Sequence, residues 1–453
     1  MNFIKDPINR FIRLETSSSI VLFSASIAAL ILANSGLSEA FLGFWKNYIT
    51  ISLPGFELSK PVLKWINDGL MAIFFFVIGL EIKREVLIGE LSDLKKASLP
   101  IVAAIGGMVF PALLFVTLNQ GKAGMEGWGI PMATDIAFSL GILTLLGKRV
   151  PVGLKIFLMA FAIIDDLGAV LVIAFFYSSK LIWANIIIGL AIVALLAILS
   201  RFKLYSKYFF FIAGVVVWVL LLKSGIHATI AGVLLALTIP IQRHIKTTTF
   251  YDKGQEILDG FLEECKKESK DKTILNHKQL DAIDEMEELT EKTASPLQFL
   301  EHRLHGWVAF IILPLFAFAN AGVVFSFSGD TNTVLASNIG LSLIIGKFAG
   351  IFVISFLAIK FKISELPKNV NFMSLAGVSF LGGLGFTMSL FINNLAFTDE
   401  VLIDSAKIGI LLGSFVAGLL GYILLRFSAG KKNPSAHLPK DFLYNRIFFR
   451  VLI

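Results

Sequence analysis

The stretch FAIIDDLGAVLVIAFF, residues 161–176, places two adjacent carboxylates, Asp165 and Asp166, inside a run apolar enough to cross a membrane. Two further charges have similar surroundings, Asp135 in MATDIAFSLGIL and Lys347 in LIIGKFAGIF. A charged side chain at the bilayer centre costs about 3 kcal/mol on insertion scales, so such groups persist where they pair, face water or bind an ion. We therefore interpret these four residues as parts of an ion or proton pathway.

The composition of the whole chain is that of an integral membrane protein. Of its 453 residues, 56% are hydrophobic and 16% are charged, whereas a soluble domain averages about 25% charged residues. The single cysteine, Cys265, excludes a disulfide framework and a cysteine-ligated metal site. The net charge of +7 does not indicate nucleic-acid binding, because the basic residues cluster between the apolar segments.

About twelve apolar segments are long enough to span a bilayer, at roughly 20 residues per helix. Basic residues concentrate in alternate loops, so the positive-inside rule places both termini in the cytoplasm and requires an even number of spans. The expected spans lie near residues 18–34, 62–82, 97–118, 126–146, 152–177, 181–200, 208–222, 225–240, 304–325, 333–359, 372–396 and 404–426.

The soluble segments divide these spans into domains. We expect residues 1–240 to hold spans one to eight, residues 301–430 to hold spans nine to twelve, and residues 431–453 to form a cytoplasmic tail. Residues 241–300 are charge-rich, with apolar residues at helical spacing, which predicts a cytoplasmic insert of short amphipathic helices. The insert is either a regulatory or partner-binding surface or a tolerated insertion.

A β-hairpin is predicted in the external loop 33–61. Its TISLPGFELS alternates polar and apolar residues around Pro54 and Gly55, a turn-forming pair. Such a hairpin would pair with its copy in a second subunit, and a solvated loop is the alternative.

Two spans contain helix-breaking residues at corresponding places in the two halves of the chain. GMEGWGIPMATDIAFSL has Gly127, Gly129 and Pro131 before Thr134 and Asp135, and SFLGGLGFTMSLFI has three glycines. Paired interruptions of this kind point to the binding site of a transporter, and glycines that only allow close helix packing are the alternative. Facing half-helix ends carry about half a unit charge each. Asp135 suits two facing N-termini, and Lys347 suits two facing C-termini.

The two adjacent aspartates cannot do one job, because neighbouring helical residues project about 100° apart. Apolar surroundings favour the protonated form of a carboxyl group, which can then exchange its proton for a hard cation such as sodium. The alternative is a buried structural ion pair with Lys347, which accounts for one aspartate but leaves the other unexplained.

Acidic and basic side chains also gather at the cytoplasmic mouth. EHRLHGW carries two histidines on one helical face, and imidazole titrates near pH 6.5, which indicates a pH-responsive cluster. Ordinary interfacial polar residues are the alternative. The pH-sensing candidates are Glu81, Arg84, Glu85, Glu301, His302 and His305.

Together these motifs resemble the NhaA-type bacterial sodium/proton antiporters, through nearly the whole chain outside 241–300. The matching motifs are GLEIKRE, ATDIAFSLGIL, AIIDDLGAVLVIAFFY, LKSGIHATIAGV, ILPLFAFANAGV, IIGKFAG and GLGFTMSLFI. The resemblance implies an all-α fold in the bacterial inner membrane, with twelve transmembrane helices, two inverted-topology repeats and broken fourth and eleventh helices. It also implies electrogenic exchange of sodium or lithium for protons in pH and sodium homeostasis, without a cofactor or enzymatic activity.

Site roles follow from the resemblance, motif by motif. Asp166 resembles the carboxylate that binds Na⁺ or Li⁺ and carries the proton, and Asp165 resembles the partner of the buried Lys347. Thr134 and Asp135 resemble the residues at the helix crossing. The implied partners are sodium or lithium ions, protons, the lipid bilayer and a second copy of the chain, with no nucleic acid.

Two other classes use similar residues. An intramembrane aspartyl protease also needs two buried aspartates, but resemblance to one would require a GxGD-like run, and here Gly385 is followed by Phe386. A sodium-coupled symporter would take up an organic acid, whereas an antiporter moves protons in response to sodium alone. The chain has no G-x-x-x-x-G-K-[ST] loop, which argues against a nucleotide-driven pump.

Overall fold

The computed structural model describes residues 7–54, 56–178, 181–202, 204–243, 245–267, 274–324 and 331–428. The tail expected at 431–453 lies outside these residues. The first half of the chain contains α1 (Pro7–Ala33), α2 (Ser38–Lys46), β1 (Tyr48–Leu53), β2 (Phe56–Pro61), α3 (Val62–Trp65), η1 (Ile66–Leu70), α4 (Met71–Leu87), η2 (Glu90–Ser92), α5 (Leu94–Asn119), η3 (Met125–Met132), α6 (Ile136–Leu145), η4 (Gly147–Arg149), α7 (Val152–Phe176), α8 (Trp183–Arg201), α9 (Lys207–Leu222) and α10 (Ile230–Thr238). The second half contains α11 (Thr247–Lys267), α12 (His277–Thr293), α13 (Pro296–Trp307), η5 (Val308–Ile312), α14 (Leu313–Asn320), α15 (Thr333–Leu341), η6 (Ser342–Gly346), α16 (Lys347–Lys360), α17 (Phe372–Leu381), α18 (Phe386–Ala396) and α19 (Glu400–Ser428).

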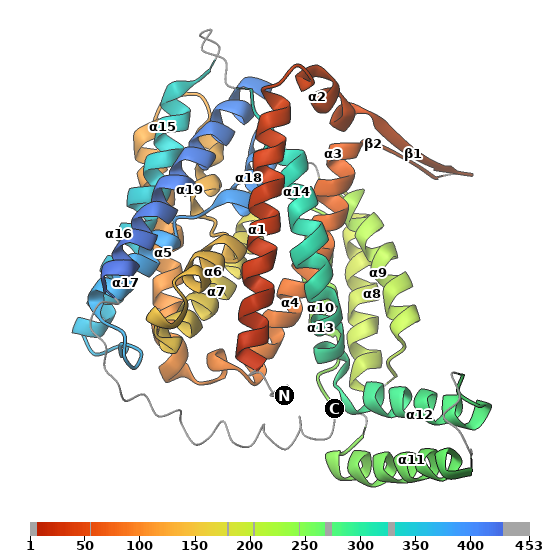
Figure 1. Cartoon of the computed structure of the whole chain (residues 1–453). Coiled ribbons are helices and arrows are strands. Elements are labelled where there is room, and N and C mark those ends of the chain that lie inside the picture. The colour runs from red at the N-terminus through yellow and green to blue at the C-terminus, as the bar shows by residue number, and fades with distance from the viewer. Residues whose placement is uncertain are drawn as a thin grey trace.

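Long apolar helices make up most of the molecule and run side by side in a bundle (Figure 1). In the described part of the chain, eight helices are long and apolar enough to cross a membrane. Two bent pairs also pass that test when each pair is taken together: α1 with α2, bent by 112°, and α17 with α18, bent by 42°. The prediction of an all-α membrane protein is therefore confirmed at this level.

Both helix interruptions expected from the sequence are present. The first half of one broken span, η3, is a 3-10 helix rather than an α-helix, and its Gly127, Gly129 and Pro131 weaken the α-helical form at this place. The chain is extended from Ala133 to Asp135 before α6 begins. The second break separates α17 from α18, and the two breaks touch where the amide of Asp135 donates to the carbonyl oxygen of Leu384 at 2.5 Å.

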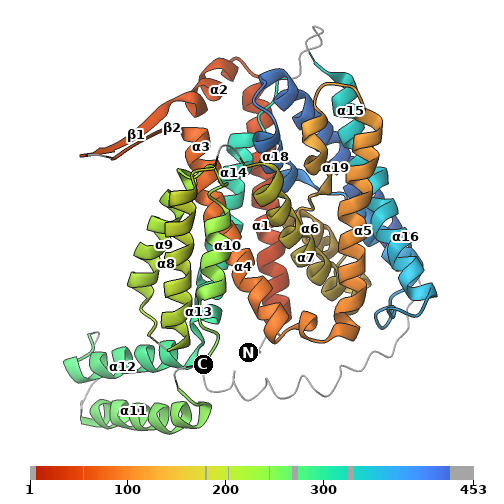
Figure 2. The same ribbon diagram turned by 180° about the vertical axis from the view of Figure 1, so that it is seen from behind.

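Small residues let α5 and α16 approach closely beside these breaks, as seen from behind in Figure 2. A Cβ atom on Gly350 would lie 2.1 Å from the carbonyl oxygen of Gly106, and one on Gly346 would lie 2.6 Å from the Cα atom of Pro111. This contact holds α16, which starts at Lys347, against the neighbouring helix.

Two smaller elements project from the bundle. The predicted hairpin is present as the antiparallel pair β1 and β2, in which Ile51 faces Leu58. At the opposite end, α11 and α12 lie across the end of the bundle (Figure 1). Residues 241–300 thus contain two helices followed by the start of α13.

Candidate functional site

The two adjacent aspartates lie in the middle of α7, and each is only 1% exposed. They face different partners, as their helical spacing requires. Lys347 donates to both carboxylate oxygens of Asp165, at 2.8 and 3.0 Å. The side chains of Lys347 and Asp165 are both 0% exposed, so this is a fully buried ion pair.

Thr134 joins this pair to the second broken helix. Its hydroxyl accepts a hydrogen bond from Lys347 at 2.9 Å and donates to the carbonyl oxygen of Gly382 at 2.8 Å. Gly382 follows the C-terminal end of α17. Lys347 therefore contacts this helix end indirectly, through the hydroxyl of Thr134.

Asp166 differs from the other buried aspartates. Its Oδ2 atom is buried and has no hydrogen-bond partner among the described residues. Both carboxylate oxygens of Asp165, and both of Asp135, do have partners. A buried carboxylate oxygen without a partner carries a large desolvation penalty unless it binds a proton or a cation.

Asp135 lies between the N-termini of α6 and α18. One carboxylate oxygen accepts from the amide of Phe138 at 3.1 Å, which caps α6, and the other accepts from the amide of Thr387 at 3.0 Å and from its hydroxyl. Two helix N-termini of about half a positive charge each roughly balance one carboxylate. Thr387 was missed in the sequence analysis, although it directly follows Phe386 at the start of the second half-helix, where a hydroxyl can reach a facing group.

Replacing Thr387 with valine is expected to lower the free energy of unfolding by about 1–3 kcal/mol, because a buried carboxylate oxygen loses a donor. Thermal unfolding in detergent measures the change. Thr387→Ser keeps the hydroxyl and is the matched control. Equal melting temperatures for the valine variant and the parent would contradict the role of this hydrogen bond.

A second polar group lies at the end of the bundle near α11 and α12. Arg84 contacts Glu85 at 2.9 Å and Glu301 at 3.4 Å, and His305 lies 3.8 Å from Glu81. Five of the six pH-sensing candidates are thus brought together. The sixth, His302, is exposed, and in the described part of the chain it makes no hydrogen bond or ion pair with them.

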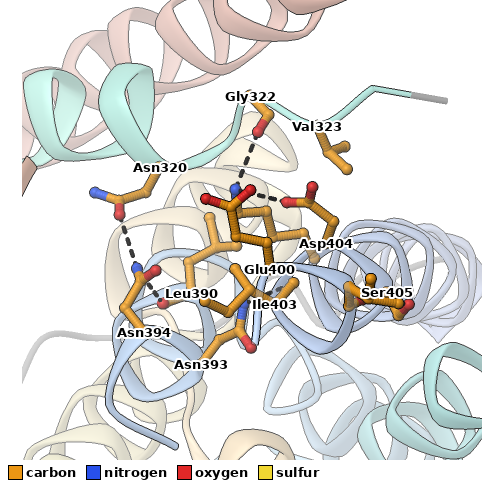
Figure 3. Close-up of polar contacts among 12 residues, drawn as sticks. Asn320, Gly322, Val323, Leu390, Asn393, Asn394, Glu400, Ile403, Asp404 and Ser405 are labelled. Carbon is orange, nitrogen blue, oxygen red and sulfur yellow. Dashed lines mark hydrogen bonds and ion pairs between the residues drawn. The ribbon is translucent and has the colours of Figure 1, made fainter. Parts of the chain in front are cut away.

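The opposite end of the bundle holds a polar network that the sequence did not suggest (Figure 3). Asn394 of α18 donates to Asn320 of α14 at 2.7 Å. Lys407 of α19 donates to the carbonyl oxygen of Gly322 at 3.1 Å and pairs with Asp404 at 3.2 Å. Asn394 thus ties the second half of a broken helix to α14, and Lys407 ties α19 to the residues that follow α14.

Comparison with known proteins places this chain in a family. The family model described as Na⁺/H⁺ antiporter 1 matches residues 9–425. The chain belongs to this family. A protein of Oleidesulfovibrio alaskensis is 46% identical over 94% of this chain and 95% of its own length. Similar proteins of Bacteroides thetaiotaomicron and Saccharophagus degradans are each 44% identical, over 92% and 95% of this chain and 96% and 94% of their own lengths. The first two carry the name Na(+)/H(+) antiporter NhaA, and the third NhaA 1.

The resemblance recognised in the sequence is therefore confirmed. Membership in the Na⁺/H⁺ antiporter 1 family, with the apolar helices above, makes the chain a multi-pass membrane protein of the bacterial type. It also favours a transporter over the protease that the sequence left open.

Proposed function

We propose that this protein exchanges sodium, or lithium in its place, for protons across the bacterial inner membrane, electrogenically and in the service of pH and sodium homeostasis. The names of the relatives support sodium and protons as substrates. The observation that carries the proposal is the buried Asp166, whose Oδ2 atom has no hydrogen-bond partner among the described residues.

Competition at Asp166 couples the two ions. A proton and a sodium ion each neutralise this carboxylate, so the binding of one displaces the other. Sodium prefers oxygen ligands, and the carboxylate of Asp166 is the main one offered. Asp165 and Lys347 form the neighbouring buried pair, a second group able to bind or release a proton. Net charge moves across the membrane when the charges of sodium and protons do not cancel in one cycle.

The proposed architecture has twelve transmembrane helices in two inverted-topology repeats, with both termini in the cytoplasm. The twelve apolar segments of the sequence and the two broken spans that meet at Asp135 support it. Inverted repeats that rock around a midplane site would expose Asp166 to each side of the membrane in turn. On this proposal α11 and α12 form a cytoplasmic insert.

The contacts of the Glu81, Arg84, Glu85, Glu301 and His305 group support a pH-sensing role on the same cytoplasmic side. Protonation of His305 beside Glu81 would turn a weak contact into an ion pair. His302 is kept as a candidate that would act from the surface.

A homodimer through β1 and β2 completes the proposal. An isolated two-stranded hairpin is marginally stable in water, and its edges offer unpaired backbone groups. Its exposed Tyr48, Ile49 and Ile51 would be covered by a second copy of the hairpin.

Transport by purified protein in proteoliposomes tests the function. A sodium or lithium gradient is expected to drive proton flux that depends on pH, with no organic solute present, and potassium is expected to drive none. A membrane-potential dye should report charge movement. Flux only with an organic acid would favour the symporter, and hydrolysis of a peptide blocked by an aspartyl inhibitor would favour the protease.

Deleting residues 252–292 is expected to leave sodium-driven proton flux near the parent level and to shift its pH profile. The ion-site residues lie elsewhere, and the ends of the deletion are close together, since a Cβ atom on Gly254 would lie 4.0 Å from Leu289. Flux across a pH series in vesicles is the measurement. Loss of all exchange in a variant that inserts normally would show that these helices are required for transport.

A further inference from the structure

The helices α11 and α12 form an antiparallel pair with one side left uncovered. Gly254 near the start of α11 faces Leu289 near the end of α12, and Cys265 near the end of α11 accepts a hydrogen bond from Gln279 at the start of α12. The helices therefore pack along their length through one face each.

Apolar side chains follow the same flank of both helices. On α11, Leu258 and Leu262 lie one turn apart and are 51% and 53% exposed; on α12, Leu280 and Ile283 are 44% and 45% exposed. Successive residues turn by about 100°, so when each helix is viewed from its own N-terminus both pairs lie clockwise of the face that contacts the other helix. Because the two helices are antiparallel, this places both pairs on one common side. These four residues are called the apolar flank below.

A groove continues this flank toward the membrane helices. A cavity of about 320 Å³ lies between α12 and α13. Its lining includes Met286 and Glu287, within one turn of Ile283, and Phe299 and Arg303 of α13. Apolar surface thus runs from the α11 and α12 pair to the helix that carries Glu301 and His305.

The surface around the apolar flank is acidic. Residues 247–293 hold 13 acidic and seven basic residues, a net charge of −6, in a chain whose total is +7. Asp284 and Glu287 lie beside Leu280 and Ile283 on α12. The complementary partner is therefore a basic segment with apolar side chains.

The end of this chain has that composition. Residues 429–453, beyond the described part, contain five Lys or Arg and one Asp, and their last part, FLYNRIFFRVLI, alternates arginines with apolar residues. Lys407 near the start of α19 contacts Gly322, which follows the end of α14. Ser428 at the end of α19 and Pro296 at the start of α13 therefore both lie at the other end of the bundle, where α11 and α12 are. Fully extended, 25 residues reach about 80 Å, nearly twice the roughly 43 Å length of the 29-residue α19.

We propose that residues 429–453 dock on the apolar flank of α11 and α12 and in the groove against α13 of the same chain, with Arg446 and Arg450 facing its acidic side chains. A basic, aromatic segment would also suit an anionic lipid surface. The α11 and α12 pair is favoured because it offers both the opposite charge and an uncovered apolar face. The proposal does not depend on the ion that the protein transports.

The chain offers a native probe for this docking. Cys265 is its only cysteine, is exposed, and lies three residues after Leu262 on the side of the apolar flank. With a second cysteine from Asn445→Cys, a bifunctional maleimide applied to membranes is expected to join the two within one chain. A polymer-tagged maleimide then counts the free thiols that remain, and the same variant with Cys265→Ser is the control.

Charge swaps separate docking from chance proximity. Arg446→Glu with Arg450→Glu is expected to slow cross-linking about threefold to tenfold, by loss of two ion pairs and their replacement with repulsion. Adding Asp284→Lys and Glu287→Lys should restore the rate. Because every change is at the surface or in the tail, the fold should be kept. As a second measurement, ending the chain at Ser428 should speed labelling of Cys265.

Three results would overturn the proposal. The first is cross-linking that occurs only between two chains. The second is a cross-linking rate that the charge swaps leave unchanged. The third is a rate of maleimide labelling at Asn445→Cys that changes with anionic lipid but not with Asp284→Lys and Glu287→Lys. The third result would assign the tail to the membrane surface.

Discussion

Sodium-driven proton movement is expected to fall to the background of vesicles without the protein when Asp166 is replaced with asparagine. The amide is close in size to the carboxylate but binds neither a proton nor a cation by charge. In everted membrane vesicles, addition of NaCl should therefore fail to reverse the quenching of a pH-sensitive dye. The buried Oδ2 atom without a partner is the reason to expect this at Asp166 rather than at Asp165, whose oxygens are held by Lys347.

A matched control is Asp93→Asn. Asp93 is exposed and caps α5 by accepting from the amide of Lys95, a role that asparagine performs equally well. Its vesicles should behave like the parent. A normal sodium response from Asp166→Asn at equal protein level would remove Asp166 from the site, and so would the absence of proton release when NaCl is added to purified protein.

The broken helices were predictable because their cause is local. Gly127, Gly129 and Pro131 weaken helix formation whatever surrounds them, so the interruption could be located without a partner. The 3-10 geometry of η3 and the three π-helical turns η1, η5 and η6 were not foreseen. These depend on how neighbouring helices pack, which no short window of sequence encodes.

Partners within the site were harder to predict because they are distant in sequence. Lys347 and Asp165 are 182 positions apart, and the residues alone did not say which aspartate Lys347 would bind. That assignment came from family resemblance. Thr387 was missed for the same reason, because its hydrogen-bond partner is Asp135, 252 positions away. His302 and His305 share a helical face by spacing, yet only His305 reaches the acidic group.

Where the two broken spans meet, the partial charges of the helix ends face side chains of opposite charge. Asp135 receives donors from the starts of α6 and α18, and Lys347 reaches the end of α17 through Thr134. With those charges opposed by hydrogen-bonded partners, Asp166 is the carboxylate of the described site that has an unpartnered oxygen for sodium. A stable arrangement of charges around one cation-binding carboxylate allows sodium and a proton to occupy it in turn.

Replacing Lys347 with alanine is expected to lower the free energy of unfolding by about 3–5 kcal/mol, because Asp165 is left buried without its cation. Thermal unfolding in detergent should show a large fall in melting temperature. The double variant Lys347→Ala with Asp165→Asn removes the orphaned charge as well and should recover much of the loss. A double-mutant cycle then gives the coupling between the two side chains.

Lys407→Ala is the comparison that makes this test specific. Lys407 also pairs with an aspartate, but Asp404 is 51% exposed, so the loss should be about 0–1 kcal/mol. Two results would contradict a stabilising role of the buried pair. One is an equal melting temperature for Lys347→Ala and Lys407→Ala. The other is a lower melting temperature for the double variant with Asp165→Asn than for Lys347→Ala alone. A large loss that is recovered only in the double variant would assign that stability to the contact between α7 and α16, two elements that must stay together while Asp166 changes its ligand.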